Sequence, residues 1–199
     1  MRREDWDRRY EETELLWSAE PNRFLVEEAA ALTPARALDL ACGEGRNAIW
    51  LAELGWQVTA VDFSEVAIAK AREQTARAGA HVEFICADLL DFEPQPAAYD
   101  LVIVLYLQLP ADERRLVLSR AASALAERGT FLLIGHDLTN LTEGVGGPSD
   151  PGVLYTPDDI VAELPELEIE KAGRVLRGVD RADRPAIDAL VRAVRRRPT

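Results

Sequence analysis

Apolar and polar residues follow two different periods along this chain, and the switches between them predict alternating strands and helices. The run of apolar residues from Tyr99 to Leu105 is almost uninterrupted, as is typical of a central strand that is covered on both faces. Ser64 favours a helix start and Gly79 a helix stop, so the helix between them is sharply bounded. The predicted strands are 35–41, 57–62, 81–86, 99–105 and 130–135, and the predicted helices are 47–54, 65–78, 112–127 and 157–164.

The end of the chain has a different pattern. Residues 167–179 and 186–195 alternate apolar and polar positions around a turn, which predicts an antiparallel hairpin, with a helix as the alternative for the last segment. Strands that alternate with helices form a parallel sheet through right-handed crossovers. We therefore expect an α/β fold with a Rossmann-like, doubly wound, seven-stranded sheet, mostly parallel with a C-terminal antiparallel hairpin.

Domain organisation follows from length and composition. A chain of 199 residues has the size of one domain. We expect residues 1–34 to form an N-terminal helical lid and 35–199 to form the Rossmann-like core. The stretch 138–156 is rich in Gly, Pro and Asp, and we expect a long loop that carries function.

Charge and cysteine content narrow the choice of partner. The chain has 35 acidic and 23 basic residues, so its surface should repel nucleic acid and favour a neutral or cationic small molecule. The charged start and the lack of a long apolar run indicate a cytoplasmic protein that does not enter a membrane. Cys42 and Cys86 lie in apolar runs and are expected to be reduced core residues, and no metal site is expected.

The strongest local signal lies where the first predicted strand ends, in the run Asp39-Leu40-Ala41-Cys42-Gly43-Glu44-Gly45-Arg46-Asn47-Ala48. Glycines there let a ligand approach the backbone, and the helix start supplies free amides. The spacing of Gly43, Gly45 and Ala48 also fits the dinucleotide fingerprint, and Asp62 follows Gly43 at the distance of an acid that holds ribose hydroxyls. An adenosine-type ligand is therefore predicted.

Two further acids refine the nature of that ligand. Asp39 beside the glycine turn would repel a pyrophosphate but suits an ammonium and a sulfonium, so it favours S-adenosylmethionine over NAD. The alternative is a strand-end acid satisfied by backbone amides. Asp88 directly follows the third strand, where it is placed to accept the adenine amino group, or else it is a surface turn acid.

These runs resemble the first three motifs of the class I S-adenosylmethionine-dependent methyltransferases, and within them the small tellurite-resistance-type and thiopurine-type enzymes. The segments that carry the resemblance are 38–47, 58–64 and 86–89, and it extends over roughly residues 15–135. Ala41 departs from the pattern, which often has glycine there. The resemblance implies a single methyltransferase domain over 1–199. With Trp17 added from the lid, the expected cofactor-binding residues are Trp17, Asp39, Ala41, Gly43, Gly45, Arg46, Asn47, Asp62, Phe63, Ala87, Asp88, Leu89 and Leu105.

Candidate catalytic residues lie at the ends of the fourth and fifth strands. In similar enzymes the corner after strand four is beside the methyl-bearing sulfur, which points to Leu105 and Tyr106. His136 ends strand five, and imidazole, with an ordinary pKa near 6.5, suits a general base. Asp137 is expected to orient His136 or to touch the substrate. Structural roles are the alternatives for Tyr106 and His136, and His81 is expected to be structural only.

The predicted function is methyl transfer from S-adenosylmethionine to a small polar acceptor, with O-methylation of a hydroxyl compound such as a sugar as the leading reaction. S-methylation of a small thiol or chalcogen compound is the alternative, followed by a nicotinamide-dependent oxidoreductase and a non-catalytic S-adenosylmethionine-binding regulator. A nucleic-acid methyltransferase is disfavoured by the net charge of −12 and by the lack of an Asn-Pro-Pro-aromatic motif after strand four. A monomer or a homodimer is expected.

Overall fold

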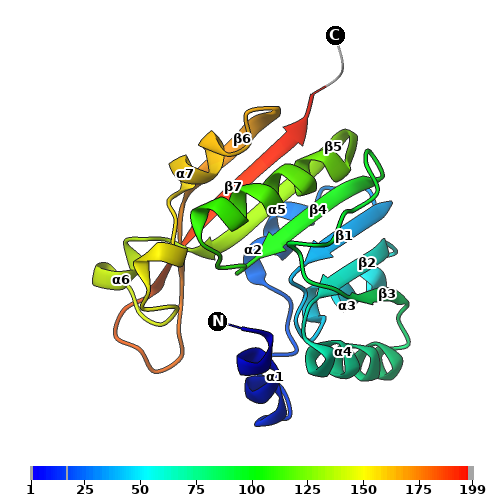
Figure 1. The fold of residues 1–199 in the computed structure, drawn as a ribbon, viewed down its shortest axis with the longest axis horizontal. Helices are drawn as coiled ribbons and strands as arrows, with labels where there is room; N and C mark the ends of the chain where they lie inside the picture. Colours follow the sequence, from blue (N-terminus) through cyan, green and yellow to red (C-terminus); the bar gives the residue numbers. More distant parts are fainter. Residues whose placement is uncertain (1, 17, 197–199) are drawn as a thin grey trace. The chain divides into compact units, whose positions relative to one another are not determined.

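The computed structural model describes residues 2–16 and 18–196, which fall into two compact units, Met1–Glu93 and Pro94–Thr199 (Figure 1). Seven strands have the order β3-β2-β1-β4-β5-β7-β6. Five of them are the strands predicted between the helices, and the last two form the predicted antiparallel hairpin. The α/β fold class is therefore confirmed.

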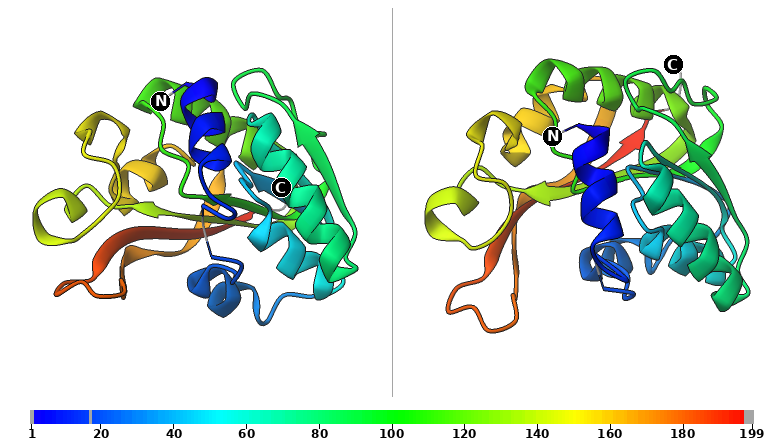
Figure 2. Two further views of the ribbon diagram at one scale, coloured as in Figure 1. Left: turned by 90° about the horizontal axis from the view of Figure 1, so that it is seen from below. Right: turned by 60° about the horizontal axis from the view of Figure 1, so that its bottom comes forward.

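The first unit is built on three parallel strands, in which β2 pairs with both β1 and β3. Helix α4 (Glu65–Ala78) begins after Ser64, whose Oγ atom accepts a 3.1 Å hydrogen bond from the amide of Ala67, and it ends at Gly79, which has a φ of 65°. The predicted limits of this helix are therefore confirmed. The other elements of the first unit are α1 (Arg3–Glu11), α2 (Arg23–Ala29), β1 (Arg36–Leu40), α3 (Arg46–Glu53), β2 (Gln57–Asp62) and β3 (Val82–Cys86) (Figure 2).

The second unit combines one parallel and two antiparallel strand pairs. β4 runs parallel to β5, and β7 runs antiparallel to both β5 and β6. The helical alternative for the last segment is wrong, because that segment is β7. The elements are β4 (Tyr99–Leu105), α5 (Ala111–Ala124), β5 (Leu125–His136), α6 (Asn140–Glu143), the 3₁₀ helix η1 (Pro151–Val153), α7 (Pro157–Ala162), β6 (Leu167–Arg177) and β7 (Ala186–Arg195).

The helix predicted over 112–127 ends three residues early, at Ala124. Leu125 is fully buried, has extended backbone angles and pairs with Tyr99 as the first residue of β5. A side chain from β7 satisfies the carbonyls at this helix end, since Nη1 of Arg195 donates to the carbonyls of Ser123 and Leu125. Tertiary pairing thus overrides the helical pattern of these residues.

Two other expectations need correction. The stretch 138–156 is not a continuous loop, because it contains α6 and η1. Cys42 is buried as expected, but Cys86 is exposed. Cys86 ends β3, which is the terminal strand of the sheet order, and several positions of this strand reach the surface. An apolar sequence run therefore did not mean burial at this position.

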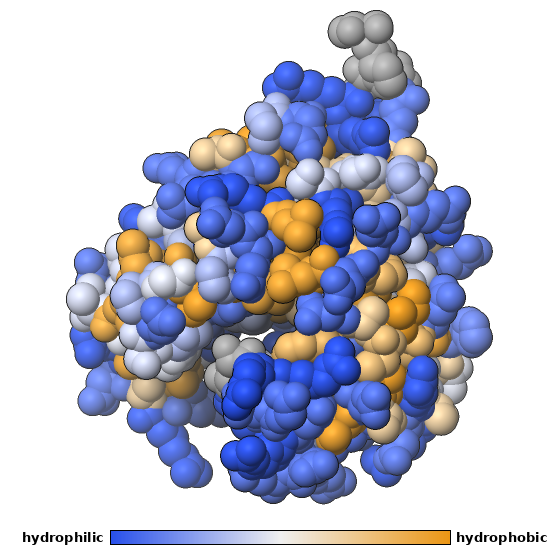
Figure 3. All heavy atoms as spheres, viewed as in Figure 1, coloured by the Kyte–Doolittle hydropathy of each residue, from blue (hydrophilic) through white to orange (hydrophobic). Residues whose placement is uncertain are grey.

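The surface is mostly polar on the face drawn in Figure 3, with apolar side chains exposed over α5, where Leu116 is 42% exposed. Isolated apolar residues of this kind are ordinary on globular proteins. Within residues 2–16 and 18–196, no helix has the length and apolar character needed to cross a membrane.

Candidate functional site

A tight backbone turn follows β1 and forms the core of the candidate cofactor site. Ala41, Gly43 and Gly45 all have left-handed backbone angles, with φ values of 65°, 54° and 80°. The amides of Ala41 and Cys42 both donate to the carbonyl of Val61, so the turn is fixed to β2. A left-handed conformation is easy for glycine and strained for alanine. This explains why the resembling family often has glycine at the position of Ala41.

The acid at the end of β2 is bonded directly to this turn. The amide of Gly43 donates a 2.9 Å hydrogen bond to Oδ2 of Asp62, and the amide of Ser64 donates a 3.0 Å bond to Oδ1. Burial raises the pKa of the Asp62 carboxyl, although these amide bonds partly offset the rise. Because each carboxylate oxygen has two lone pairs, Asp62 retains acceptor capacity for ribose hydroxyls.

Asp39 is the least satisfied acid of the first unit. It is 1% exposed, and among the described residues its Oδ2 atom has no hydrogen-bond partner. Burial, and next the charge of Asp62, raise the pKa of the Asp39 carboxyl to about 7, with Arg46 acting in the opposite direction. A buried carboxylate without a full set of partners is costly unless a cation or a donor approaches it. Oδ2 is therefore not satisfied by backbone amides, contrary to the structural alternative.

The side chains that follow Gly43 hold the N-terminal segment. The amide of Leu16 donates to Oε2 of Glu44 at 2.9 Å, and Nη1 of Arg46 donates to Oγ of Ser18 at 3.1 Å. Similarly, the amide of Asn22 donates to Oδ1 of Asn47 at 2.9 Å. Cofactor contacts from Arg46 and Asn47 are therefore best expected from their backbone amides, at the start of α3.

The predicted lid contact Trp17 lies outside the described residues. The remaining predicted adenosine contacts lie after β2 and β3. The amide of Ala87 donates to the carbonyl of Asp62, which brings the two strand ends together. Oδ1 of Asp88 accepts a 2.9 Å bond from the amide of Leu90, so this acid does form a turn. The roles of Phe63 and Leu89 in binding adenine stay predictions, as does the second role of Asp88.

The catalytic candidates of the second unit gather around an acid that the sequence analysis did not select. The hydroxyl of Tyr106 donates to Oδ2 of Asp188 at 2.8 Å, and Nδ1 of His136 lies 3.3 Å from Oδ1 of the same carboxylate. The rings of Tyr106 and His136 have centroids 5.1 Å apart. Tyr106 also has a φ of 58°, a strained conformation that tertiary structure must hold in place.

Asp188 and Arg177 are the functional candidates that sequence reasoning missed. Asp188 is 0% exposed, and Nε of Arg177 donates to its Oδ2 at 2.8 Å and to the Tyr106 hydroxyl at 2.9 Å. Burial opposes ionisation of Asp188, but the nearby His136 imidazole and the hydrogen bond from Arg177 outweigh burial and lower the pKa of Asp188. One signal was available, since Asp188 is a lone acid in the apolar run 186–191.

Asp137 does not take the orienting position predicted for it. The carboxylate beside His136 is that of Asp188, whereas Oδ1 of Asp137 accepts from the amide of Thr139 and from Nε of Arg174. Successive side chains of a strand point to opposite faces, which separates Asp137 from His136. Leu105 is buried at the end of β4.

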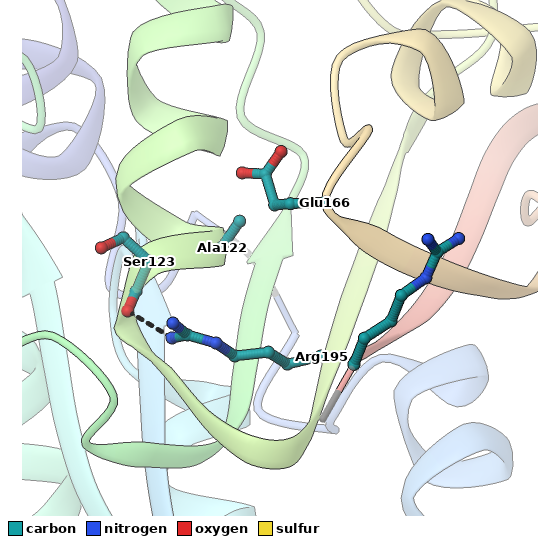
Figure 4. A pocket seen from close by; sticks show the side chains of 5 residues that line it. Ala122, Ser123, Glu166 and Arg195 are labelled. Atoms are coloured by element: carbon teal, nitrogen blue, oxygen red, sulfur yellow. Dashed lines mark hydrogen bonds between the residues drawn. The ribbon is translucent and has the colours of Figure 1, made fainter. Parts of the chain in front are cut away.

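A cavity of about 420 Å³ lies elsewhere in the second unit, lined by Ala122, Ser123, Glu166, Arg195 and Arg196 (Figure 4). Arg195 reaches the carbonyls of Ser123 and Leu125, at the beginning of β5, whereas His136 ends that strand. The cavity is therefore at the far end of β5 from the catalytic candidates, and it is not part of the candidate active site.

Comparison with known proteins identifies the domain. Residues 37–129 match the family described as "Methyltransferase domain". Ribosomal RNA small subunit methyltransferase C of Alcanivorax borkumensis is 31% identical over 108 residues, which are 52% of this chain and 33% of that protein. The probable S-adenosyl-L-methionine-dependent methyltransferase TehB of Haemophilus influenzae is 34% identical over 65 residues, 33% of this chain and 23% of that protein.

Solved structures share the fold over nearly the whole chain. A protein described under "Conversion of a Disulfide Bond into a Thioacetal Group during Echinomycin Biosynthesis" has a TM-score of 0.75 at 24% identity, covering 97% of this chain and 92% of its own. The crystal structure of TehB from Haemophilus influenzae has a TM-score of 0.73 at 19% identity, covering 88% of this chain and 62% of its own.

The predicted resemblance is thus confirmed: residues 37–129 match the methyltransferase domain family, and the chain shares its fold with solved structures that include TehB. All three cofactor motifs found in the sequence lie in this range or begin at its edge. The chain spans less than half the length of the curated relatives that it matches.

Proposed function

We propose that this protein transfers the methyl group of S-adenosylmethionine to a hydroxyl of a small polar acceptor. The observation that supports S-adenosylmethionine as the methyl donor is Asp39, a buried acid at the glycine turn whose Oδ2 has no hydrogen-bond partner among the described residues. S-adenosylmethionine brings an ammonium and a sulfonium, and either charge would stabilise the ionised form of Asp39. The pyrophosphate of a nicotinamide cofactor would instead be repelled.

The remaining donor contacts follow from the same turn. Asp62, already bonded to Gly43, would accept the ribose hydroxyls through its remaining lone pairs. The backbone amides at the start of α3 would meet the carboxylate of the methionine moiety. The other proposed contacts with the adenosine and the methyl-bearing end are Phe63, Ala87, Asp88, Leu89 and Leu105.

For the acceptor, the supporting observation is His136 beside the buried carboxylate of Asp188. A hydroxyl is a weak nucleophile until its proton leaves, so a base within hydrogen-bond reach accelerates attack on the sulfonium by roughly 10²-fold or more. Tyr106 would orient the acceptor. The net charge of −12 supports a small polar molecule, such as a sugar, over nucleic acid.

S-methylation of a small thiol or chalcogen compound is the second candidate. It is supported by the match to TehB and by the structural neighbour described through a disulfide-to-thioacetal conversion. A thiol that ionises near neutral pH needs a base far less than an alcohol does. The two candidates therefore differ in how strongly turnover depends on His136. The methyltransferase domain match gives the oxidoreductase alternative no support.

Release of S-adenosylhomocysteine, measured across hydroxyl, thiol and amine acceptors, tests the proposal. We expect turnover with hydroxyl compounds that falls by about 10²-fold or more in His136→Gln. His81→Gln is the matched control, because it removes the other histidine of the chain, which is exposed in the first unit. Turnover with thiols that survives in His136→Gln would replace O-methylation by S-methylation. Full activity of His136→Gln on hydroxyl compounds would exclude His136 as the general base.

A further inference from the structure

The hairpin formed by β6 and β7 contributes a carboxylate to the strand that ends in His136. Asp188 is opposite His136 in the β5–β7 register and opposite Val175 in the β6–β7 register. Directly opposed residues of antiparallel strands place their side chains on the same face. Arg177, two positions after Val175, shares that face. The side chains of His136, Asp188 and Arg177 therefore lie on one face of three neighbouring strands.

We propose that Asp188 is a positioning residue that holds the proton of neutral His136 on Nδ1, leaving the Nε2 lone pair as the base. This inference rests on the proposed function, because it assigns a role to His136 in O-methylation. Nδ1 lies 3.3 Å from Oδ1 of Asp188, and neither atom has a hydrogen-bond partner among the described residues, so each is available to pair with the other. A carboxylate accepts only, so the atom facing it on a neutral imidazole is the protonated nitrogen.

The two oxygens of Asp188 have different partners. Oδ2 accepts from the Tyr106 hydroxyl at 2.8 Å and from Nε of Arg177 at 2.8 Å, which leaves Oδ1 for His136. The hydroxyl proton of Tyr106 is already donated to Oδ2, and its oxygen accepts from Arg177. Tyr106 is therefore poorly suited to take a proton from the acceptor, and His136 is the general base among these side chains.

Arg177 makes a buried negative charge tolerable beside His136. The nearby His136 imidazole and the hydrogen bond from Arg177 outweigh burial and keep the pKa of Asp188 low, so the carboxylate is ionised at neutral pH. The charged and titratable groups that face the imidazole are Tyr106 from the end of β4, Asp188 from β7 and Arg177 from β6. Gly147 packs against the ring, since a Cβ there would be 2.9 Å from both Cγ and Nδ1 of His136.

The reaction balances with this assignment. The acceptor oxygen forms a bond to the methyl carbon while the bond from that carbon to sulfur breaks, so the sulfonium becomes a neutral thioether. The hydroxyl proton moves to Nε2, and His136 becomes an imidazolium with its Nδ1–H still directed at Asp188. The positive charge lost by the donor thus reappears on His136, where the carboxylate stabilises it.

Nitrogen NMR of protein labelled with ¹⁵N-histidine tests the proposal without any acceptor. The chain has two histidines, so only two imidazoles appear, and the His81→Gln variant assigns them. We expect neutral His136 to be protonated on Nδ1 in the unmodified protein. Exposed His81 serves as the internal reference for an imidazole without this partner. Protonation of neutral His136 on Nε2 would overturn the proposal outright.

Two variants then separate positioning from packing. Asp188→Asn can offer a donor to Nδ1 and should shift the tautomer toward Nε2–H, whereas Tyr106→Phe removes a donor from the other oxygen and should preserve the Nδ1–H form. An unchanged tautomer in a folded Asp188→Asn protein would contradict the role of Asp188. If Asp188→Asn does not fold, the unmodified spectrum still decides.

Activity gives a second readout that a merely structural role would not produce. Asp188→Asn should lower kcat by about 10²-fold with KM within a few-fold, and should move the low-pH limb of the kcat profile to lower pH. A fall in kcat with an unmoved limb would contradict positioning. Should the tautomer prove to be Nδ1–H while hydroxyl compounds are not methylated, the proposed acceptor fails and the positioning of His136 by Asp188 stands.

Discussion

The amide of Gly43 donates a 2.9 Å hydrogen bond to Oδ2 of Asp62, so the glycine turn after β1 and the acid that ends β2 form one unit. The amide of Ser64 donates to the other oxygen of Asp62, and the side chain of Ser64 is the N-cap of α4. The geometry of the turn is therefore set before any ligand binds. Preorganisation of this kind lowers the cost of binding, because fewer groups must be ordered by the ligand.

Replacing Asp62 should weaken cofactor binding. Asp62→Ala removes the proposed acceptor of the ribose hydroxyls and leaves the Gly43 amide unpaired, so we expect a loss of roughly 1–3 kcal/mol in the binding free energy of S-adenosylmethionine. Isothermal calorimetry measures this loss. Asp91→Ala removes the same charge from an exposed position of the first unit and is the control. Equal affinities of Asp62→Ala and Asp91→Ala would refute the ribose assignment.

Cofactor binding should release a proton from Asp39 below neutral pH. In the free protein the pKa of this carboxyl is about 7 instead of 3.8, so it is largely protonated at pH 6, and a cationic ligand requires the ionised form. Affinity should therefore rise with pH toward about 7. Calorimetry at pH 6 in two buffers of different ionisation enthalpy detects the proton. Asp39→Asn should bind more weakly and lose this buffer dependence, and a wild-type protein that releases no proton would contradict the assignment.

The same carboxyl affects stability in the opposite direction. A folded-state pKa above the unfolded value means that the folded protein binds more protons between about pH 4 and pH 7. The contribution of Asp39 to the free energy of unfolding is therefore favourable at low pH and is lost as the pH rises through 7. Denaturation of the cofactor-free protein at pH 5 and pH 7.5 should show a larger stability loss in the wild type than in Asp39→Asn. Identical losses would count against the raised pKa.

Ala41→Gly should stabilise the protein. Relief of the left-handed strain at a φ of 65° gains about 1–2 kcal/mol, and the greater freedom of glycine in the unfolded chain returns about 0.5–1 kcal/mol. We expect a net gain of roughly 0.5–1 kcal/mol in the free energy of unfolding. Ala48→Gly, in the interior of α3, should instead lose about 1 kcal/mol. Urea denaturation distinguishes these signs, and a destabilised Ala41→Gly would show that the alanine methyl packs usefully.

Two neighbouring glycines test the contact between the 138–156 segment and His136. Gly146 and Gly147 have similar left-handed φ values of 70° and 77°, so alanine costs similar backbone strain at each. An added Cβ meets the His136 ring within 3.0 Å only at Gly147, and meets nothing within 4 Å at Gly146. We expect turnover to fall clearly more in Gly147→Ala than in Gly146→Ala. Equal turnover in steady-state assays would mean that this contact does not position His136.

That segment is also expected to respond to ligands. Three of its four glycines cluster at 144, 146 and 147, which makes it a candidate for closing over the acceptor. Hydrogen exchange of residues 138–156 should slow when S-adenosylhomocysteine and an acceptor are added together. Exchange in α4, bounded by Ser64 and Gly79, is the reference for a region that does not close. No change in the segment relative to α4 would rule out closure.

Sequence reasoning succeeded where the determinants are local. Ser64 and Gly79 fix the ends of α4 through their own backbone and side-chain geometry, and the sequence alone predicted both limits. Asp188 could not be selected in this way, because its meeting with His136 depends on the register of β5 with β7. The exposure of Cys86 and the early end of α5 likewise depend on which strand each segment joins. Contacts set by strand pairing were the ones that local patterns missed.

Methyl transfer from S-adenosylmethionine to oxygen can be followed with a labelled methyl group. The protein is incubated with S-adenosylmethionine that carries a ¹³C-labelled methyl group and with a mixture of small hydroxyl, thiol and amine acceptors, and the product is read by carbon NMR. We expect the label to appear as an oxygen-bound methyl group and His136→Gln to abolish this signal. Label that remains in S-adenosylmethionine with every acceptor, or that appears only on sulfur or nitrogen, would contradict it.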